Sequence, residues 1–118
     1  MIKQDREPIV MEYNLYRRVE LMSKDERSLL LFFEVCLVDR YGKIDVRHMN
    51  EIDTAIVKRW VEEGLIEYGR IKFCDIINSS THWVRFSENA WKMAQYERRL
   101  RSDRCLSEVK YRKVGIDE

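Results

Sequence analysis

The chain has 118 residues and a formal net charge of +1, with 45% apolar and 36% charged residues. This length suits one domain with one modest core, and the near-zero charge does not by itself predict a polyanionic partner. The longest nearly apolar run, residues 29–38, is too short to cross a membrane, and the first ten residues lack the apolar stretch of a secretory signal, so we expect a cytoplasmic protein.

The N-terminal part of the chain predicts one helix. Residues 1–7 show no structural pattern and are expected to be disordered. Pro8 suits the first turn of a helix, because its missing N–H is not needed there. Apolar residues at helical spacing then predict a helix over about residues 9–21.

A second helix follows. Ser23 and Glu26 have the spacing of a capping box, in which each side chain accepts a hydrogen bond from the other residue's backbone N–H. This predicts a helix over residues 24–40, ended by Gly42. Its middle is apolar nearly all round, so we expect it to be the central core helix, with Glu34 at its one open edge.

The middle of the chain predicts a short strand and a third helix. Residues 43–46 alternate in polarity and are typical of a small strand, and residues 47–49 suit one helical turn. Asp53 fits an N-cap, so the helix is expected over residues 54–63, with Gly64 as its C-terminal stop.

The third helix has one apolar and one polar side when it is wound at its normal period. The apolar side, which we expect to be buried, contains Ile52, Ile56, Val57, Trp60 and Val61. The polar side contains Thr54, Lys58, Arg59 and Glu62.

Two strands and a last helix complete the domain. Residues 65–68 and 70–77 are expected to be extended, with Gly69 marking a bulge or bend between them. Residues 78–81 form a turn, and residues 82–86 return as a strand, whose Trp83 is expected to be largely buried.

The C-terminal part of the chain is basic. Ser87 is expected to cap a helix over residues 88–104, and residues 105–118 are expected to form a flexible tail, so that residues 8–104 make up the domain. Residues 92–113 contain eight basic and three acidic side chains, a local charge of +5. This charge suits either a solvated helix with ion pairs or an arm that contacts phosphates.

The order of these elements resembles the winged helix-turn-helix family. The resemblance is carried by KIDV (residues 43–46), IVKRWVEEGLIEYGRI (residues 56–71) and HWVRF (residues 82–86). The flanking helices are similar to those of the MarR-like branch, with the second helix of the motif shortened or missing. The resemblance implies an α+β, mostly α fold with a two- to three-stranded antiparallel sheet and flanking N- and C-terminal helices. It also implies a recognition helix, residues 54–63, that enters the major groove of DNA.

The resemblance further implies a DNA-binding surface on this chain. On the recognition helix the expected contacts are Thr54, Lys58 and Arg59. The expected phosphate contacts around it are Lys43, Arg47, Arg70 and Lys72. On the last helix Arg98, Arg99 and Arg101 either follow the DNA backbone or belong to a helix that pairs with the N-terminal helix across a homodimer.

Two functions therefore remain open. The first is a small DNA-binding transcription regulator that acts as a dimer. The second is a winged-helix module that binds a protein of a larger nucleic-acid-processing or transcription complex, because the net charge is near zero and Glu62 lies on the expected recognition face. The small, charge-rich chain also resembles many phage and mobile-element proteins in style.

Catalytic and metal-binding motifs are missing from the sequence. All four glycines are isolated, and neither HExxH nor GxSxG occurs. The three cysteines form no CxxC pair, and Cys74 with His48 and His82 fits no zinc-ligand spacing. Cys36 should be inert within the apolar helix, which leaves Cys74 as the candidate reactive thiol. We expect no enzyme activity, no cofactor and no metal.

Overall fold

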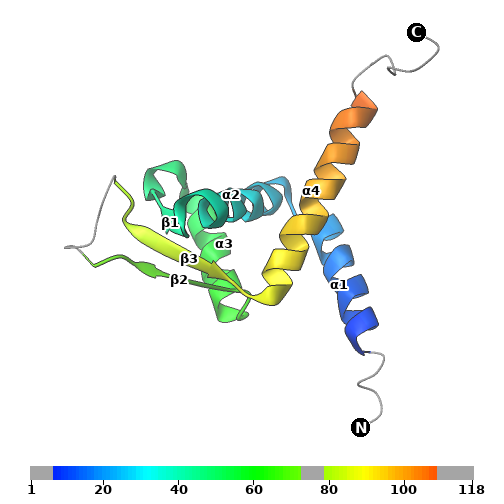
Figure 1. Cartoon of the computed structure of the whole chain (residues 1–118), viewed down its shortest axis with the longest axis horizontal. Coiled ribbons are helices and arrows are strands. Elements are labelled where there is room, and N and C mark those ends of the chain that lie inside the picture. Colours follow the sequence, from blue (N-terminus) through cyan, green and yellow to red (C-terminus); the bar gives the residue numbers. More distant parts are fainter. Residues whose placement is uncertain (1–6, 73–78, 109–118) are drawn as a thin grey trace.

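The computed structural model describes residues 7–72 and 79–108, which form a mostly helical fold with a small antiparallel sheet (Figure 1). The elements are α1 (Glu7–Leu21), α2 (Lys24–Arg40), β1 (Lys43–Ile44), the 3₁₀ turn η2 (Val46–His48), α3 (Glu51–Glu62), β2 (Ile66–Arg70), β3 (His82–Phe86) and α4 (Glu88–Glu108). This confirms the expected α+β, mostly α class, with three strands and flanking helices in a winged-helix-like order. No helix in the described ranges has the length and apolar character needed to span a membrane.

The elements form two parts that meet at α2. The sheet, α2 and α3 make up one part, and α1 and α4 cross beside it (Figure 1). The crossing is fixed by aromatic packing, because the rings of Tyr16 and Tyr96 meet edge to face with centroids 5.6 Å apart. Beyond this crossing the end of α4 extends away from the body of the fold (Figure 1).

The core is built around α2, as its apolar middle predicted. Leu30 and Phe33 of α2 are fully buried, together with Met93 of α4. Trp60 of α3 is 1% exposed, which confirms that the tryptophan side of this helix faces the core. Buried apolar area of this kind is the main source of stability in a domain of this size.

The side of α3 that was expected to be buried was too broad. Ile52 is 54% exposed and Val61 is 41% exposed, whereas Ile56, Val57 and Trp60 are buried. The prediction that all five are buried was therefore wrong for the two outer positions. A twelve-residue helix that packs on one side needs only a narrow apolar stripe, so residues at the edges of the stripe reach solvent.

The helix caps follow local side-chain chemistry. The capping box of Ser23 and Glu26 is present, which confirms the predicted start of α2. For α3 the expected N-cap Asp53 was wrong. Asn50 is the N-cap, its side chain accepts a hydrogen bond from the Asp53 N–H at 2.8 Å, and Asp53 completes the box from the third helical position.

The first strand is shorter than the expected residues 43–46. Residues 45 and 46 do not continue the strand, because the carboxylate of Asp45 accepts a hydrogen bond from the Arg47 N–H at 3.0 Å and starts η2. The single helical turn expected at residues 47–49 is present as this 3₁₀ turn, which begins one residue earlier.

The sheet has the strand order β1-β3-β2 and is antiparallel throughout. The bulge expected at Gly69 is not there, because Gly69 pairs in regular register with Trp83. A Cβ at position 69 would lie 2.8 Å from the indole of Trp83, so the glycine makes room for that ring. Trp83 is only half-buried, which corrects the prediction that it is largely buried.

The outer ends of the first and last helices were predicted slightly short. The N-terminal helix already includes Glu7, and α4 continues to Glu108 rather than stopping near residue 104. The remaining residues of the expected disordered N-terminus and flexible tail, 1–6 and 109–118, lie outside the described residues, as do residues 73–78 of the expected extended segment and turn.

Candidate nucleic-acid interface

Helix α3 is held so that one side faces outward. Its buried side chains Ile56, Val57 and Trp60 rest on the core. After Glu62 the backbone turns sharply through Gly64, which has a φ of +77°, and the Leu65 N–H donates to the carbonyl of Trp60 at 2.9 Å. This turn leads directly into β2, so the end of α3 lies next to the paired strands β2 and β3.

The outward side of α3 holds the three expected recognition residues. Lys58 is exposed and makes no ion pair within the described residues. The guanidinium of Arg59 lies 3.6 Å from the carboxylate of Glu26 on α2, and the hydroxyl of Thr54 donates back to the Asn50 carbonyl. Of the three, Lys58 is therefore the best placed to contact a ligand.

The same side of α3 also carries acidic residues. Glu51 and Glu62 are both exposed and lie near Lys58 on the helix. Because opposite charges alternate there, the outward side of α3 has no strong positive field. Contacts to phosphates would have to come from neighbouring elements.

Of the side chains expected to contact phosphates, one is already paired within the chain and others are exposed. Arg47 donates to both oxygens of the Asp45 carboxylate, with Nη2 at 2.6 Å from Oδ2. These hydrogen bonds lower the pKa of Asp45 to about 2. Arg70 and Lys72 are exposed near the end of β2, and Lys43 is half-buried on β1.

The arginines of α4 are mostly engaged within the chain. Arg98 forms an ion pair with Glu34 of α2, whose residue is 8% exposed. Glu34 is therefore buried and paired, which corrects its expected place at the open edge of the helix. Arg101 contacts the buried carboxylate of Glu97 at 3.6 Å, whereas Arg99 is exposed.

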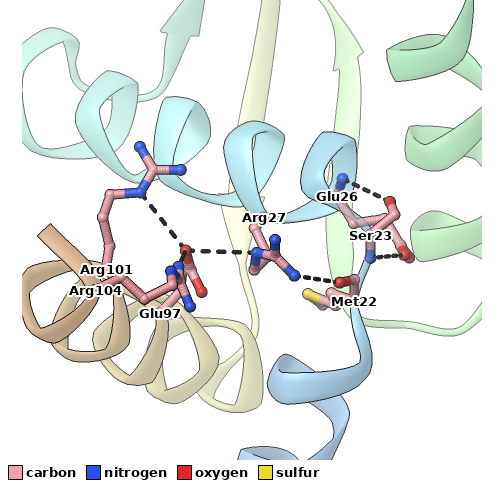
Figure 2. A network of polar contacts seen from close by, with 7 residues as sticks. All are labelled: Met22, Ser23, Glu26, Arg27, Glu97, Arg101 and Arg104. Carbon is pink, nitrogen blue, oxygen red and sulfur yellow. Dashed lines mark hydrogen bonds and ion pairs between the residues drawn. The ribbon is translucent and has the colours of Figure 1, made fainter. Parts of the chain in front are cut away.

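Glu97 is the centre of a polar cluster that the sequence interpretation missed. Its side chain is 0% exposed, and the guanidiniums of Arg27, Arg101 and Arg104 all approach its Oε2 (Figure 2). We call these four residues the Glu97 cluster. The spacing of Glu97, Arg101 and Arg104 on one side of a helix is visible in the sequence. Arg27 lies seventy positions earlier, and no local pattern connects it to Glu97.

Two other potentially reactive side chains, His82 and Cys36, are packed within the fold. His82 stacks on Tyr68 with ring centroids 5.3 Å apart, and burial together with the charge of Arg70 lowers its pKa. Burial raises the pKa of the Cys36 thiol, which makes that thiol less reactive. Cys105 is exposed, and Cys74 lies outside the described residues.

No set of three histidine, cysteine, aspartate or glutamate side chains within residues 7–72 and 79–108 is arranged to hold a metal ion. Comparisons of the chain with protein-family models, with curated proteins and with solved structures find no match.

Proposed function

We propose that this chain is a small DNA-binding regulator that presents α3 to the major groove and acts as a homodimer. One observation carries the proposal: α3 has a buried back anchored by Trp60, an exposed front with Lys58, and a wing of β2 and β3 that begins three residues after its C-cap. A recognition helix needs this division into a core-facing and a groove-facing side.

Neighbouring elements support this assignment. Arg70 at the end of β2 and Lys72 just after it are exposed, and their flexible side chains suit contacts to phosphate oxygens. Lys58 suits a contact to a guanine edge or to a phosphate. Arg59 can add to this surface, because its side chain is 58% exposed and its guanidinium lies 3.6 Å from the carboxylate of Glu26.

The proposal is tested by the binding of random-sequence duplex DNA, measured by fluorescence anisotropy at about 50 and 200 mM salt. We expect the native chain to bind and to weaken steeply with salt. We expect Lys58→Ala to weaken binding at the lower salt by about threefold to tenfold and to leave the melting temperature unchanged.

The matched control is Arg17→Ala, which removes one exposed positive charge from α1. This control should bind DNA like the native chain. Equal affinities of all three proteins would remove α3 from the interface, and no binding at the lower salt would contradict the proposed function.

A second candidate function is favoured by the two large apolar residues that α3 exposes. Ile52 and Val61 flank the acidic positions Glu51 and Glu62, a mixture that suits a protein surface better than a phosphate backbone. Under this alternative the domain is a subunit or inhibitor within a larger complex. It predicts that DNA is not retained at modest salt and that Ile52→Lys abolishes binding of a specific protein partner.

A further inference from the structure

A basic pocket lies between the start of α2 and the end of α4. It is a hollow of about 380 Å³, and its walls are Lys24, Arg27, Ser28, Arg101, Arg104 and Cys105. The two helices contribute residues that are far apart in the sequence and that meet only in the folded chain. The volume lies within the range of small-ligand sites in proteins.

The pocket holds more positive charge than the chain neutralises. Three of its four cations, Arg27, Arg101 and Arg104, share one carboxylate oxygen, Oε2 of Glu97, at 3.8, 3.6 and 2.6 Å. Four cations stand against the carboxylate of Glu97, and they remain in excess by +1 when the exposed Asp25 and Asp103, next to Lys24 and Arg104 in the sequence, are counted too. A positive excess attracts anions and is screened less in a recess than on an open surface.

The burial of Glu97 organises the arginines and leaves their outer atoms accessible. The Glu97 side chain is 0% exposed, whereas the side chains of Arg101 and Arg104 are each 46% exposed. Arg27 is held further by donating to the carbonyl of Met22 (Figure 2). Each guanidinium has five N–H donors, so several donors on each remain for a ligand.

This set of donors matches a phosphate group. Arginine forks bind two phosphate oxygens at once, and a lysine beside them adds a mobile point charge. Lys24 is exposed at the first position of α2, and the exposed residue Ser28 adds a hydroxyl on the same side of that helix.

We propose that Lys24, Arg27, Arg101 and Arg104 form a binding site for a phosphate group. The phosphate belongs either to a nucleic-acid backbone or to a free phosphorylated compound, which share this chemistry. The site lies on the other side of α2 from α3, because Glu26 pairs with Arg59 of α3 while Arg27 turns toward Glu97 of α4 (Figure 2). It therefore goes beyond the proposed recognition surface.

Binding is tested with inorganic pyrophosphate as the probe, by isothermal titration calorimetry on the full chain, at an ionic strength matched with sodium chloride. We expect the native chain to bind and Lys24→Gln with Arg101→Gln to bind at least about tenfold more weakly. The melting temperature of the native chain should rise with pyrophosphate, since a ligand that binds only the folded state stabilises it.

The control is Arg17→Gln with Arg40→Gln, which removes the same charge from exposed positions on α1 and at the other end of α2. It should bind pyrophosphate like the native chain. The single variant Lys24→Gln leaves the Glu97 cluster intact, so it tests the site even if the double variant folds poorly, and it too should weaken binding. No binding by the native chain, or equal binding by the pocket and control variants, would overturn the proposal.

Duplex DNA then separates the two sources of phosphate. If the pocket binds a DNA backbone, the double variant should lower the slope of log affinity against log salt by about 2. If the pocket binds a free compound, the variant should lose pyrophosphate binding and keep its DNA affinity. If the native chain fails to bind DNA, the proposed function is refuted, but the pyrophosphate measurement still tests the pocket.

Discussion

At the scale of single residues, carboxylates with arginine partners shape this protein. Glu97 and Glu34 are both buried. Glu34 is paired with Arg98 of another helix, and Glu97 is paired with Arg104 of its own helix. Burying an unpaired carboxylate would cost several kcal/mol, so the arginines are required to keep these residues inside. Arg98 has a carboxylate of its own in Glu34 and is for the same reason less available to an outside partner, whereas three arginines share the single carboxylate of Glu97.

Asp45 shows how one carboxylate can make stability depend on pH. Its pKa is about 2 in the folded chain, and an unfolded aspartate titrates near about 3.9. The folded state therefore favours the ionised form, and this contribution is complete above about pH 4 and is lost as the pH falls toward 2. We expect the unfolding free energy to decrease over this window.

The measurement is urea unfolding at several pH values for the native chain and for Asp45→Asn. The variant should be less stable at pH 7 and should lose less stability between pH 4 and 2. Asp103→Asn, which removes an exposed carboxylate from α4, serves as the comparison. An Asp45→Asn protein with the full acid sensitivity of the native chain would refute this role of Asp45.

Residue-level prediction from the sequence succeeded where the partners are close together in the chain. The box of Ser23 and Glu26 spans three positions and was found. The pair of Glu34 and Arg98 spans sixty-four positions, so no periodicity could reveal it, and Arg98 was expected either on a DNA backbone or in a helix that pairs across a dimer. Pairing between distant helices depends on how they pack, which the sequence alone does not show.

At the scale of elements, glycines end two of the helices. Gly42 follows α2 with a φ of +84°, and Gly64 follows α3 with a φ of +77°. Both positions are strained for any residue with a Cβ, by about 1–2 kcal/mol. The two positions differ in the room they leave for a side chain. A Cβ at position 42 would lie 2.8 Å from the Val84 carbonyl oxygen, whereas a Cβ at position 64 would meet nothing within 4 Å.

We therefore expect Gly42→Ala to cost more stability than Gly64→Ala. The conformational cost is shared, and the contact with Val84 adds about 1–3 kcal/mol at position 42, since backbone atoms of a central strand cannot move aside freely. Chemical unfolding of the two variants beside the native chain gives both values. Equal losses in the free energy of unfolding would mean that the backbone of Val84 moves away from position 42 at little cost.

The elements themselves could be predicted because each has a strong local signal. The order, the type and most boundaries of the helices follow from apolar period, caps and glycines. The start of α3 was misplaced because Asn50 and Asp53 are equally good N-caps, and their reciprocal hydrogen bonds use both. The regular pairing of Gly69 depends on Trp83 in another strand, which no reading of β2 alone contains.

At the scale of the whole molecule, α1 and α4 stand beside the winged-helix part rather than within it. They pack on each other within one chain, through Tyr16 and Tyr96. Near the end of α4, Leu106 remains 53% exposed. In the proposed homodimer, this side chain near the end of a projecting helix is a candidate contact with the second copy.

We expect Leu106→Glu to weaken a homodimer by about tenfold, the effect of about 1.4 kcal/mol. Light scattering after size exclusion, at several concentrations, gives the mass of the native chain and of the variant. The control Val38→Glu places the same charge at a 66% exposed position on α2 and should leave the dimer intact. A native chain that is monomeric at all concentrations would remove the dimer from the proposal.

The change in burial along α4 has a consequence for motion. Ala90, Met93 and Ala94 are fully buried, whereas residues 101–107 are all exposed. Amide hydrogens near Met93 should exchange with solvent only through global unfolding, and those near the helix end through local fraying. The basic pocket draws two of its arginines from this end, so a bound phosphate would slow exchange there and leave the rest of α4 unchanged.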